Sequence, residues 1–237
     1  MRFLCLVPAR GGSKGIPRKN LITVAGRPLV TWTIEQALSA HTDLDVVVST
    51  DDAEIAEVSR SAGADVPFLR PAELALDTTA TEPVIEHTLD QLEALGRSYD
   101  AVILLQATSP LRLPGTIDRA LAQFRDEGAD SLVGVVPQAP FIWSLGEPPT
   151  AAYDVASRPR RQDLTPHTLR YRETGSLYVT ATRVYREQHN RLGGRIGLFI
   201  MDEIEGVDID SDLDLRLTEQ TLSRIQQTST DKSVPAP

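Results

Sequence analysis

Short apolar segments alternate with amphipathic helical stretches along most of this 237-residue chain. The apolar segments have the length of buried strands, and turn-forming residues separate them from the stretches of helical period. Strands that alternate with helices form right-handed βαβ units, in which helices cover both faces of a mostly parallel sheet. The order of these segments therefore predicts the α/β class.

Residue types at the ends of the segments set the boundaries that we expect. Pro28 suits the first turn of a helix that ends at Ser39, and Asp52 can cap a helix over 53–62. Thr78 and Thr79 are expected to cap the helix that follows them rather than to bind a ligand. The expected strands are 3–7, 45–49, 101–105, 131–136, 177–180 and 196–201, and the other expected helices are 82–95 and 115–127. We predict a Rossmann-like, mostly parallel sheet sandwiched by helices, with ligands at the carboxyl ends of the strands.

The segment from about 138 to 175 differs from the sheet core, because it is rich in proline and arginine and has few periodic apolar positions. It is predicted to leave the sheet, either as a small projecting arm or as a mobile surface loop, and the sequence favours neither. We expect one domain over residues 1–222 that includes this excursion. The polar segment 223–237 is expected to be a disordered tail.

The segment after the first strand, VPARGGSKGIPRKN at 7–20, has the composition of a polyphosphate cradle. Its glycines allow sharp turns in which backbone N–H groups face an anion. Its cations, which can neutralise phosphate charge, are Arg10, Lys14, Arg18 and Lys19. The alternative is a solvated basic turn, but the preceding strand favours a phosphate site. A Walker A loop is excluded because GxxxxGK[ST] is absent.

Two carboxylates, Asp208 and Asp210, occupy alternate positions in the segment VDIDSDLDL. Alternate residues of a strand project from one face, about 6–7 Å apart, so this pair can hold Mg²⁺ directly or through water. Helix capping is the competing interpretation, because Ser211 and Asp214 form an S-x-x-D box. We assign Asp212 and Asp214 to the cap, and Asp208 and Asp210 to the metal.

Further motifs follow in order along the chain: FLRPAELALDTTA at 68–80, LLQATSPLR at 104–112, RPRRQDL at 158–164 and RETGSLY at 172–178. Together with the basic loop and the two aspartates, they resemble the motifs of the cytidylyltransferases that make CMP-sialic acid and related CMP-activated acids. The resemblance extends over roughly residues 1–222. Leaving aside 68–80, a further similarity, five motifs occur in the order of the family, and such a set is far more specific than one motif. One departure is QATSPLR, which is QPTSPLR in the family.

The resemblance implies roles for individual residues. The CTP-binding residues would be Ala9, Arg10, Gly11, Gly12, Ser13, Lys14, Asn20, Arg70 and Asp77. The acceptor would contact Gln106, Ser109, Arg112, Arg160, Arg161 and Arg172. The residues implied in catalysis are Arg10, Lys14, Lys19 and Asp210, with Mg²⁺, or Mn²⁺ in its place, at Asp208 and Asp210. In the family the arm crosses to a second subunit, which implies a homodimer whose site is completed in trans.

The expected reaction is a direct in-line displacement, in which an acceptor oxygen attacks the α-phosphorus of CTP and pyrophosphate leaves. Positioning and charge neutralisation dominate catalysis in such phosphoryl transfers. No covalent intermediate is expected, because none of the histidines lies beside a Ser or Cys in a way that suggests a relay, and none has metal-ligand spacing: His41, His87, His167 and His189.

The acceptor is expected to be a small anion. The sialate enzymes bind their sugar through a Lys and an aromatic pair, and the corresponding stretches of this chain, APFIWS and HNRLGG, contain neither feature. A nonulosonic (sialic-type) sugar acid is favoured by the frequency of such enzymes in the family. The alternatives are a small phosphonate such as phosphonoformate, a uridylyl- or guanylyltransferase, and a catalytically silent nucleotide-binding module. Retention of Asp208 and Asp210 argues against the silent module.

The composition of the chain argues against nucleic-acid and membrane partners. The net charge of −9 argues against nucleic acid, which normally requires a broad basic surface. The single cysteine, Cys5, lies in the first apolar strand, as expected of an inert core residue in a reducing compartment. No apolar run approaches the ~20 residues that span a bilayer. We expect a cytoplasmic protein with neither nucleic-acid nor membrane partners.

Overall fold

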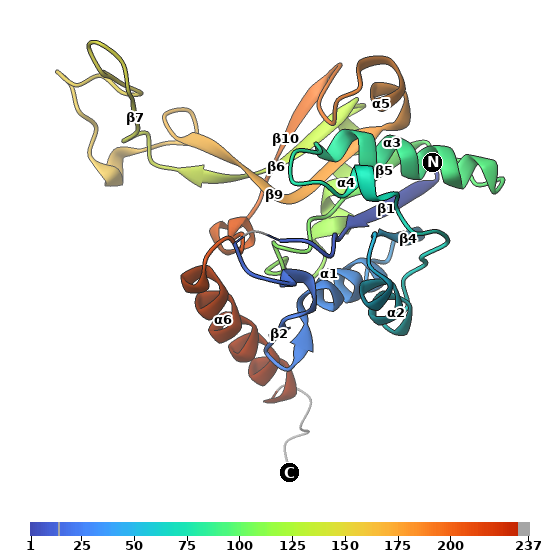
Figure 1. The fold of residues 1–237 in the computed structure, drawn as a ribbon. Coiled ribbons are helices and arrows are strands. Elements are labelled where there is room, and N and C mark those ends of the chain that lie inside the picture. Colours follow the sequence, from blue (N-terminus) through green and yellow to red (C-terminus); the bar gives the residue numbers. More distant parts are fainter. Residues whose placement is uncertain (14, 232–237) are drawn as a thin grey trace.

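The computed structural model describes residues 1–13 and 15–231 (Figure 1). Its centre is a six-stranded sheet of order β10-β6-β9-β5-β1-β4. The strands are β1 (Phe3–Pro8), β4 (Leu44–Ser49), β5 (Ala101–Leu104), β6 (Ser131–Gln138), β9 (Arg170–Ala181) and β10 (Ile196–Ile200). Strand β9 runs antiparallel to β5 and β6, and the other neighbouring strands are parallel. The mostly parallel sheet is confirmed.

Helices cover both faces of this sheet. The helices that do so are α1 (Leu29–Leu38), α2 (Ala53–Ser61), α3 (Thr81–Ala94), α4 (Thr116–Glu127) and α5 (Thr182–Gln188), and a further helix is α6 (Asp212–Asp231). Side chains of α1, α2 and α4 share one apolar cluster with the sheet, whereas α3 and α5 contribute to a second cluster. The sheet is therefore sandwiched, as predicted. Helix α6 packs apart from both layers, against the short hairpin formed by β2 (Thr23–Val24) and β3 (Arg27–Pro28).

Local signals placed several boundaries correctly. The Asp52 carboxylate accepts hydrogen bonds from the backbone N–H groups of Glu54 (2.9 Å) and Ile55 (3.1 Å), which confirms it as the cap of α2. Pro28 precedes α1 and Ser39 follows its last residue. Thr79 does not cap α3, because the N-cap is Ala80 and has no side-chain cap bond.

The predicted excursion at 138–175 does project from the body as an arm (Figure 1). Its core is a small hairpin of β7 (Trp143–Ser144) and β8 (Thr150–Ala151), followed by the 3-10 turn η3 (Arg161–Asp163). The predicted ends of the arm need correction. Gln138 belongs to β6 and residues 170–175 belong to β9; residues 135–138 pair with 170–173, and the register shifts between Val133 and Val135. This paired root has no apolar alternation in the sequence because much of it is exposed to solvent.

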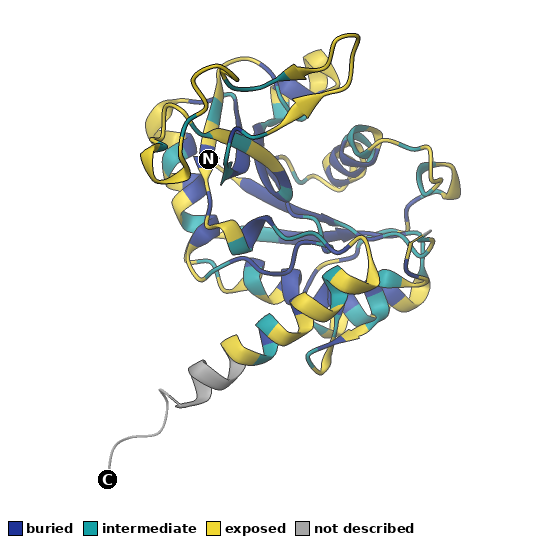
Figure 2. Cartoon of the chain, turned by 90° about the vertical axis from the view of Figure 1, so that its left-hand side faces the viewer, coloured by how far each residue is buried: buried dark blue, intermediate teal, exposed yellow. Residues whose placement is uncertain are grey.

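The C-terminal segment also needs correction, because the expected tail at 223–237 begins as helix. Helix α6 continues to Asp231, and residues 232–237 lie outside the described part of the chain. The predicted capping box is present: Ser211 N donates to Asp214 Oδ2 (2.8 Å), and Asp214 N donates to Ser211 Oγ (3.3 Å). Residues 212–225 of α6 are mostly exposed or intermediate (Figure 2). Once its first turns are anchored, a helix propagates through such polar sequence. No described helix is long and apolar enough to cross a membrane.

Cys5 is fully buried in β1, as its sequence context predicted. Burial raises the pKa of its thiol to about 12, an effect that the nearby Arg112 guanidinium only partly offsets. Because the thiolate is the reactive form, the thiol stays protonated and inert at neutral pH.

Candidate active site

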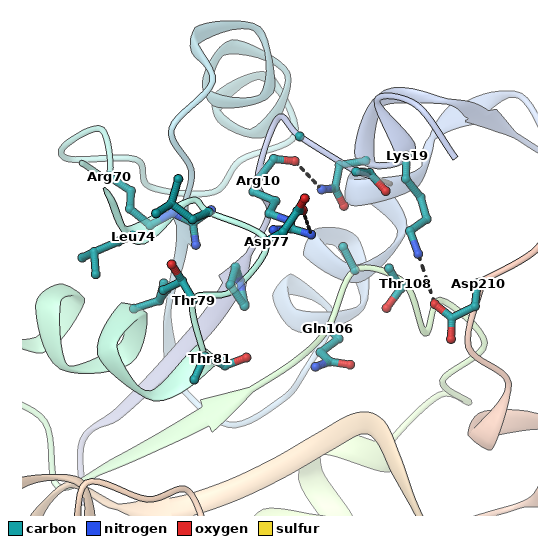
Figure 3. A pocket seen from close by; sticks show the side chains of 18 of the residues that line it. Arg10, Lys19, Arg70, Leu74, Asp77, Thr79, Thr81, Gln106, Thr108 and Asp210 are labelled. Atoms are coloured by element: carbon teal, nitrogen blue, oxygen red, sulfur yellow. Dashed lines mark hydrogen bonds and ion pairs between the residues drawn. The ribbon is translucent and has the colours of Figure 1, made fainter. Parts of the chain in front are cut away.

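A crevice of about 360 Å³ opens where β1 and β5 end at the carboxyl edge of the sheet (Figure 3). Segments far apart in the sequence meet in it: the basic loop, the turn before α3, the turn after β5 and the segment before α6. Predicted residues that line it are Arg10, Gly12, Ser13, Lys19, Asn20, Arg70, Asp77, Gln106, Asp208 and Asp210. The structure thus brings most of the predicted nucleotide and metal residues together at the expected edge.

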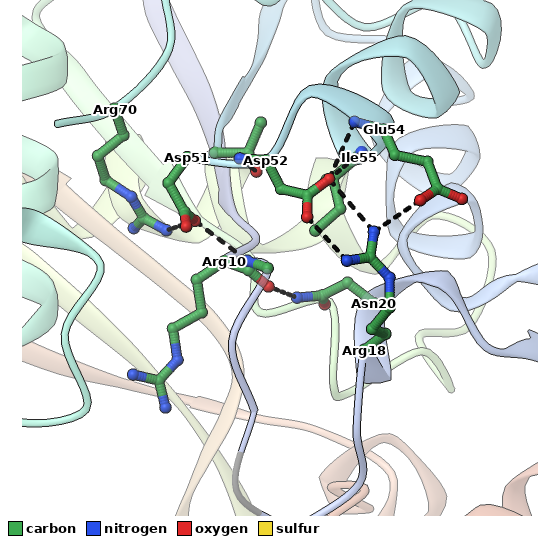
Figure 4. A network of polar contacts seen from close by, with 10 residues as sticks. Arg10, Arg18, Asn20, Asp51, Asp52, Glu54, Ile55 and Arg70 are labelled. Carbon is green, nitrogen blue, oxygen red and sulfur yellow. Dashed lines mark hydrogen bonds and ion pairs between the residues drawn. The ribbon is translucent and has the colours of Figure 1, made fainter. Parts of the chain in front are cut away.

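The basic loop is fixed by hydrogen bonds to its own backbone and to the turn after β4 (Figure 4). The Asn20 amide, largely buried, donates to the carbonyl of Arg10 (2.9 Å). Gly11 N donates to Asp51 Oδ1 (3.0 Å), and a side chain at Gly11 would come within 2.6 Å of the Asp52 carboxylate. Glycine is therefore required there by close approach, and the loop enters the crevice in a defined conformation.

Two predicted loop residues support the site rather than line it. Ala9 is buried, and its N–H donates to Ser49 O (3.0 Å), continuing the β1–β4 ladder. The N–H of Gly11 is already taken by a carboxylate and is not free for phosphate. Lys14, predicted to bind CTP and to act in catalysis, lies outside the described residues.

Arg18 and Lys19 are adjacent in sequence but point to different partners. Arg18 has a left-handed backbone (φ 51°), and its guanidinium pairs with Asp52 and Glu54 at the start of α2. Burial tends to raise the pKa of Asp52, but hydrogen bonds from the α2 backbone and from Arg18 lower it overall. Lys19 instead reaches the crevice. Arg18 and Lys19 therefore do not act as one cluster.

Arg70 provides a buried cation in the crevice wall. Only 5% of the residue is exposed, and its backbone N–H is bound to Thr50 O (2.7 Å). Its Nη2 lies 3.5 Å from Asp51 Oδ1, yet its Nε and Nη2 have no hydrogen-bond acceptor among the described residues. Burial lowers the pKa of this guanidinium. Because an under-paired buried charge is costly, an anion in the crevice would be strongly favoured at this point.

Arg10 also lines the crevice and is paired with Asp77, its Nη2 lying 2.9 Å from Asp77 Oδ1. Each side chain is about one-third exposed, so the pair is accessible from the crevice. An anionic ligand in the crevice would compete with Asp77 for the guanidinium of Arg10.

The segment carrying Asp208 and Asp210 is not a regular strand, although its side chains alternate as predicted. Ile209 turns into the core, and its N–H donates to Thr108 O (2.9 Å). Lys19 Nζ donates to Ile209 O (2.5 Å) and lies 3.4 Å from Asp210 Oδ1. Both carboxylates therefore face the crevice, and one lies beside a lysine.

These carboxylates fit a hard divalent cation through their oxygen donors. Within residues 1–13 and 15–231, no group of three or more His, Cys, Asp or Glu residues could hold a metal by itself. A metal at Asp208 and Asp210 would need further ligands from water or from a bound phosphate. This requirement agrees with a site that takes its metal together with a nucleotide.

Two predicted acceptor contacts are buried beneath the crevice, which corrects the prediction for them. The Arg112 guanidinium is bound by the carbonyls of Ser176 (2.7 Å) and Gln106 (2.8 Å), and burial lowers its pKa to about 10. Ser109, 1% exposed, donates to Asp208 Oδ1 (3.4 Å). Both lie in the core, and of the three predicted acceptor contacts in QATSPLR only Gln106 lines the crevice.

The arginines of the arm do not reach the crevice of their own chain. Arg160 pairs with Asp163, Arg161 lies 5.9 Å from the ring centre of Phe141, and Arg172 donates to Gly206 O (3.0 Å). None of the three lines the crevice. The predicted contact of these three arginines with the acceptor is therefore not made within a single chain.

Some crevice residues were missed by the sequence analysis. Thr79 and Thr81, at the start of α3, line the wall, whereas Thr79 had been expected only as a helix cap. Asp51 was also missed, although it joins the basic loop to Arg70. The sequence does carry a signal for Asp51, because two adjacent aspartates follow β4 at the edge of the sheet where ligands are expected. Asp52 explains only the cap of α2.

The family model described as "Cytidylyltransferase" matches residues 4–190. Pseudaminic acid cytidylyltransferase of Campylobacter jejuni is 31% identical over 220 residues, 91% of this chain and 94% of that protein. CMP-N,N'-diacetyllegionaminic acid synthase of Legionella pneumophila is 32% identical over 237 residues, 96% of this chain and 99% of that protein. N-acylneuraminate cytidylyltransferase B of Danio rerio is 36% identical over 92% of this chain but only 51% of that protein.

A similar fold is found in the solved structure of CMP:2-keto-3-deoxy-manno-octonic acid synthetase complexed with CTP. Its TM-score is 0.70 at 15% identity, and the match covers 95% of this chain and 100% of that one. At this identity the likeness concerns the fold alone. It supports the Rossmann-like prediction independently of the motifs.

Proposed function

The chain belongs to the cytidylyltransferase family, and from this premise we propose that it transfers CMP from CTP to a nonulosonic (sialic-type) sugar acid with release of pyrophosphate. It is a CTP-dependent nucleotidyltransferase, as the family model and its relatives show. The acceptor class is inferred from relatives named for pseudaminic, legionaminic and N-acylneuraminic acids. These relatives give the phosphonate alternative no support.

The observation that carries the proposal is the mixture of charges in one crevice. Arg10, Lys19 and Arg70 present cations, while Asp208 and Asp210 present carboxylates at the same opening. A bare triphosphate would be attracted by the first group and repelled by the second. A triphosphate that carries a divalent cation satisfies both, because the cation faces the carboxylates and the phosphate oxygens face the basic groups.

Each crevice residue has a separate role in the proposed in-line displacement. When bound, Mg²⁺ would be held by Asp208 and Asp210 and would supply charge neutralisation for the phosphates. Arg10 and Lys19 lie where they can stabilise the charge that develops on departing pyrophosphate. Arg70 would bind the nucleotide through its unpaired guanidinium nitrogens. Gln106, at the other side of the crevice, would hydrogen-bond the acceptor and fix its attacking oxygen in line.

The arm supports a second proposal, that the protein is a homodimer. Its large apolar side chains are exposed in the single chain, with Trp143 at 51% and Leu145 at 100%. Arg160, Arg161 and Arg172 lie away from the crevice of their own chain. A second copy would cover the apolar surface of the arm and would receive these arginines near its own crevice. The cytoplasmic location expected from the sequence stays a prediction.

The proposal is tested by measuring pyrophosphate release from CTP and Mg²⁺ with a panel of acceptors. The panel contains sialic, legionaminic, pseudaminic and 3-deoxy-octulosonic acids beside phosphonoformate. Turnover with one or more of the nonulosonic acids is expected. Turnover with phosphonoformate alone would replace the proposed acceptor class, and turnover with UTP or GTP in preference to CTP would contradict the nucleotide.

A further inference from the structure

Gly175 lies on β9 directly behind the carboxamide of Gln106. A Cβ built at this glycine would overlap Gln106 Oε1 and come within 2.9 Å of its Cδ, while Ser109 Oγ would be 3.5 Å away. The φ angle of Gly175 is not in the positive range, so its backbone conformation does not require glycine. What the position requires is the absence of a side chain, because the Gln106 side chain occupies that space.

The backbone of Gln106 cannot move away to relieve such an overlap. Its carbonyl accepts hydrogen bonds from Arg112 Nη2 (2.8 Å) and from Ser109 N (3.2 Å). The same Arg112 guanidinium binds the carbonyl of Ser176, the residue after Gly175 (2.7 Å). One buried cation therefore ties the two backbones together, and only rotation of the Gln106 side chain remains free.

We propose that Gly175 is a positioning residue for the acceptor site: its missing side chain fixes the direction in which Gln106 presents its carboxamide to the crevice. The inference rests on the proposed function, in which Gln106 contacts the sugar acid. A carboxamide has an acceptor oxygen and a donor nitrogen, so its rotation changes which acceptor groups can be matched. Sites that hydrogen-bond a substrate discriminate strongly when a partner is lost or misplaced.

A second glycine, Gly134 on the neighbouring strand β6, provides a structural contrast. A Cβ there would lie 2.8 Å from the carbonyl oxygen of Leu177 and 2.7 Å from Met201 Sδ. The backbone carbonyl cannot rotate away, so Gly134→Ala is expected to lower the thermal unfolding midpoint. At Gly175 the overlapping atoms belong to the end of a flexible side chain, so Gly175→Ala is expected to leave this midpoint close to that of the wild type.

The test compares Gly175→Ala, Gln106→Ala and the double variant by steady-state kinetics and CTP binding. Gly175→Ala is expected to raise the KM for the sugar acid roughly tenfold, the effect of losing about one hydrogen bond, with the Kd for CTP unchanged. Gln106→Ala should show a similar rise. In the Gln106→Ala background, Gly175→Ala should not raise the KM for the sugar acid further, because the carboxamide that it displaces is absent.

Several results would overturn the inference. These are an unchanged acceptor KM in Gly175→Ala, a further tenfold rise in the double variant, and loss of folded protein on Gly175→Ala. An unchanged acceptor KM in Gln106→Ala, with turnover intact, would overturn it while leaving CMP transfer standing. Absence of turnover with every sugar acid in the wild type would instead defeat the proposed function, and the inference with it.

Discussion

Two basic regions of this molecule hold their cations in opposite ways. In the crevice, Arg70 is 5% exposed, and two of its nitrogens lack an acceptor within the described part of the chain. The Lys19 side chain is 14% exposed beside Asp210. In the arm, the Arg160 side chain is 71% exposed, and Arg158 lies over the ring of Phe141 at 4.6 Å. Burial has already removed much of the water from the crevice cations, whereas the arm cations remain solvated.

This difference indicates what each region requires from a ligand. A desolvated, under-paired cation binds an anion at little further desolvation cost, so the crevice is preorganised for phosphate. An exposed arginine on an aromatic ring gains only when another surface removes it from water. The same residue type thus marks a small-molecule site in one region and a protein interface in the other.

The largest expected effect is a loss of kcat on replacement of Lys19, which replacement of its neighbour Arg18 should not cause. Lys19→Met is expected to lower kcat by roughly 10²- to 10³-fold, the usual loss when one stabilising donor is removed from a transition state. Arg18→Met is the matched control, because this guanidinium pairs with Asp52 and Glu54 away from the crevice, and kcat should change little. Rates of pyrophosphate release decide the question. Equal losses in both variants would mean that the loop cations do act as one cluster.

The next effect concerns the buried cation of the crevice. Arg70→Met is expected to weaken CTP binding by roughly 10- to 100-fold, because a charge-assisted hydrogen bond is lost. The unfolding midpoint of the free protein should not fall, since the under-paired buried charge is removed as well. Calorimetric titration with CTP and Mg²⁺ measures the first effect, and thermal unfolding the second. Arg27→Met, on the β2–β3 hairpin, is the control; unchanged CTP affinity in Arg70→Met would refute the assignment.

A smaller effect tests the arm as an interface. Replacement of Trp143 and Leu145 by Ser is expected to raise the dimer dissociation constant at least about tenfold, because apolar side chains at the centre of an interface contribute most of its free energy. Sedimentation velocity measures the change. Leu213→Ser on α6 is the control, since this side chain is also exposed but lies outside the arm. A wild-type protein that sediments as a monomer throughout would contradict the interface.

The smallest effect concerns the cap that supports the basic loop. Asp52→Ala is expected to lower the free energy of unfolding by about 1 kcal/mol at neutral pH, through loss of the N-cap. The folded-state pKa of Asp52 is lowered from 3.8, so its contribution is fully present above that value and is lost as the pH falls through the folded-state pKa. Urea unfolding at pH 7 and near pH 2.5 should show the difference between variant and wild type shrinking at the lower pH. A constant difference would be inconsistent with an ionised cap.

The sequence predicted those parts of the site that depend on local spacing. The glycine-rich loop after β1 and the alternation around Ile209 place their side chains by backbone geometry alone, so both were found in the expected positions. Arg112 was misassigned because its burial depends on Thr33, Gln36 and Ser176, which are distant in sequence. Arg18 could not be told from Lys19, because the left-handed turn that separates them carries no residue signal.

The same distinction applies to the fold. The alternating pattern predicted the sheet and both helical layers, because burial of one face leaves a periodic record in the sequence. It did not predict the extension of β9 into the root of the arm, where side chains are largely exposed and leave no such record. Nor did it predict that α6 continues through polar sequence to Asp231. Patterns therefore predicted the buried structure best, and the exposed structure least.

The central claim is that the crevice works on a nucleotide whose divalent cation is held by Asp208 and Asp210. The most direct measurement is pyrophosphate release from CTP and a nonulosonic acid, with and without Mg²⁺, by the wild type and by Asp210→Ala. We predict turnover that requires Mg²⁺ in the wild type, and loss of that turnover in a variant that still unfolds cooperatively at the wild-type midpoint. An Asp210→Ala protein with wild-type turnover, or wild-type turnover that needs no divalent cation, would contradict the claim.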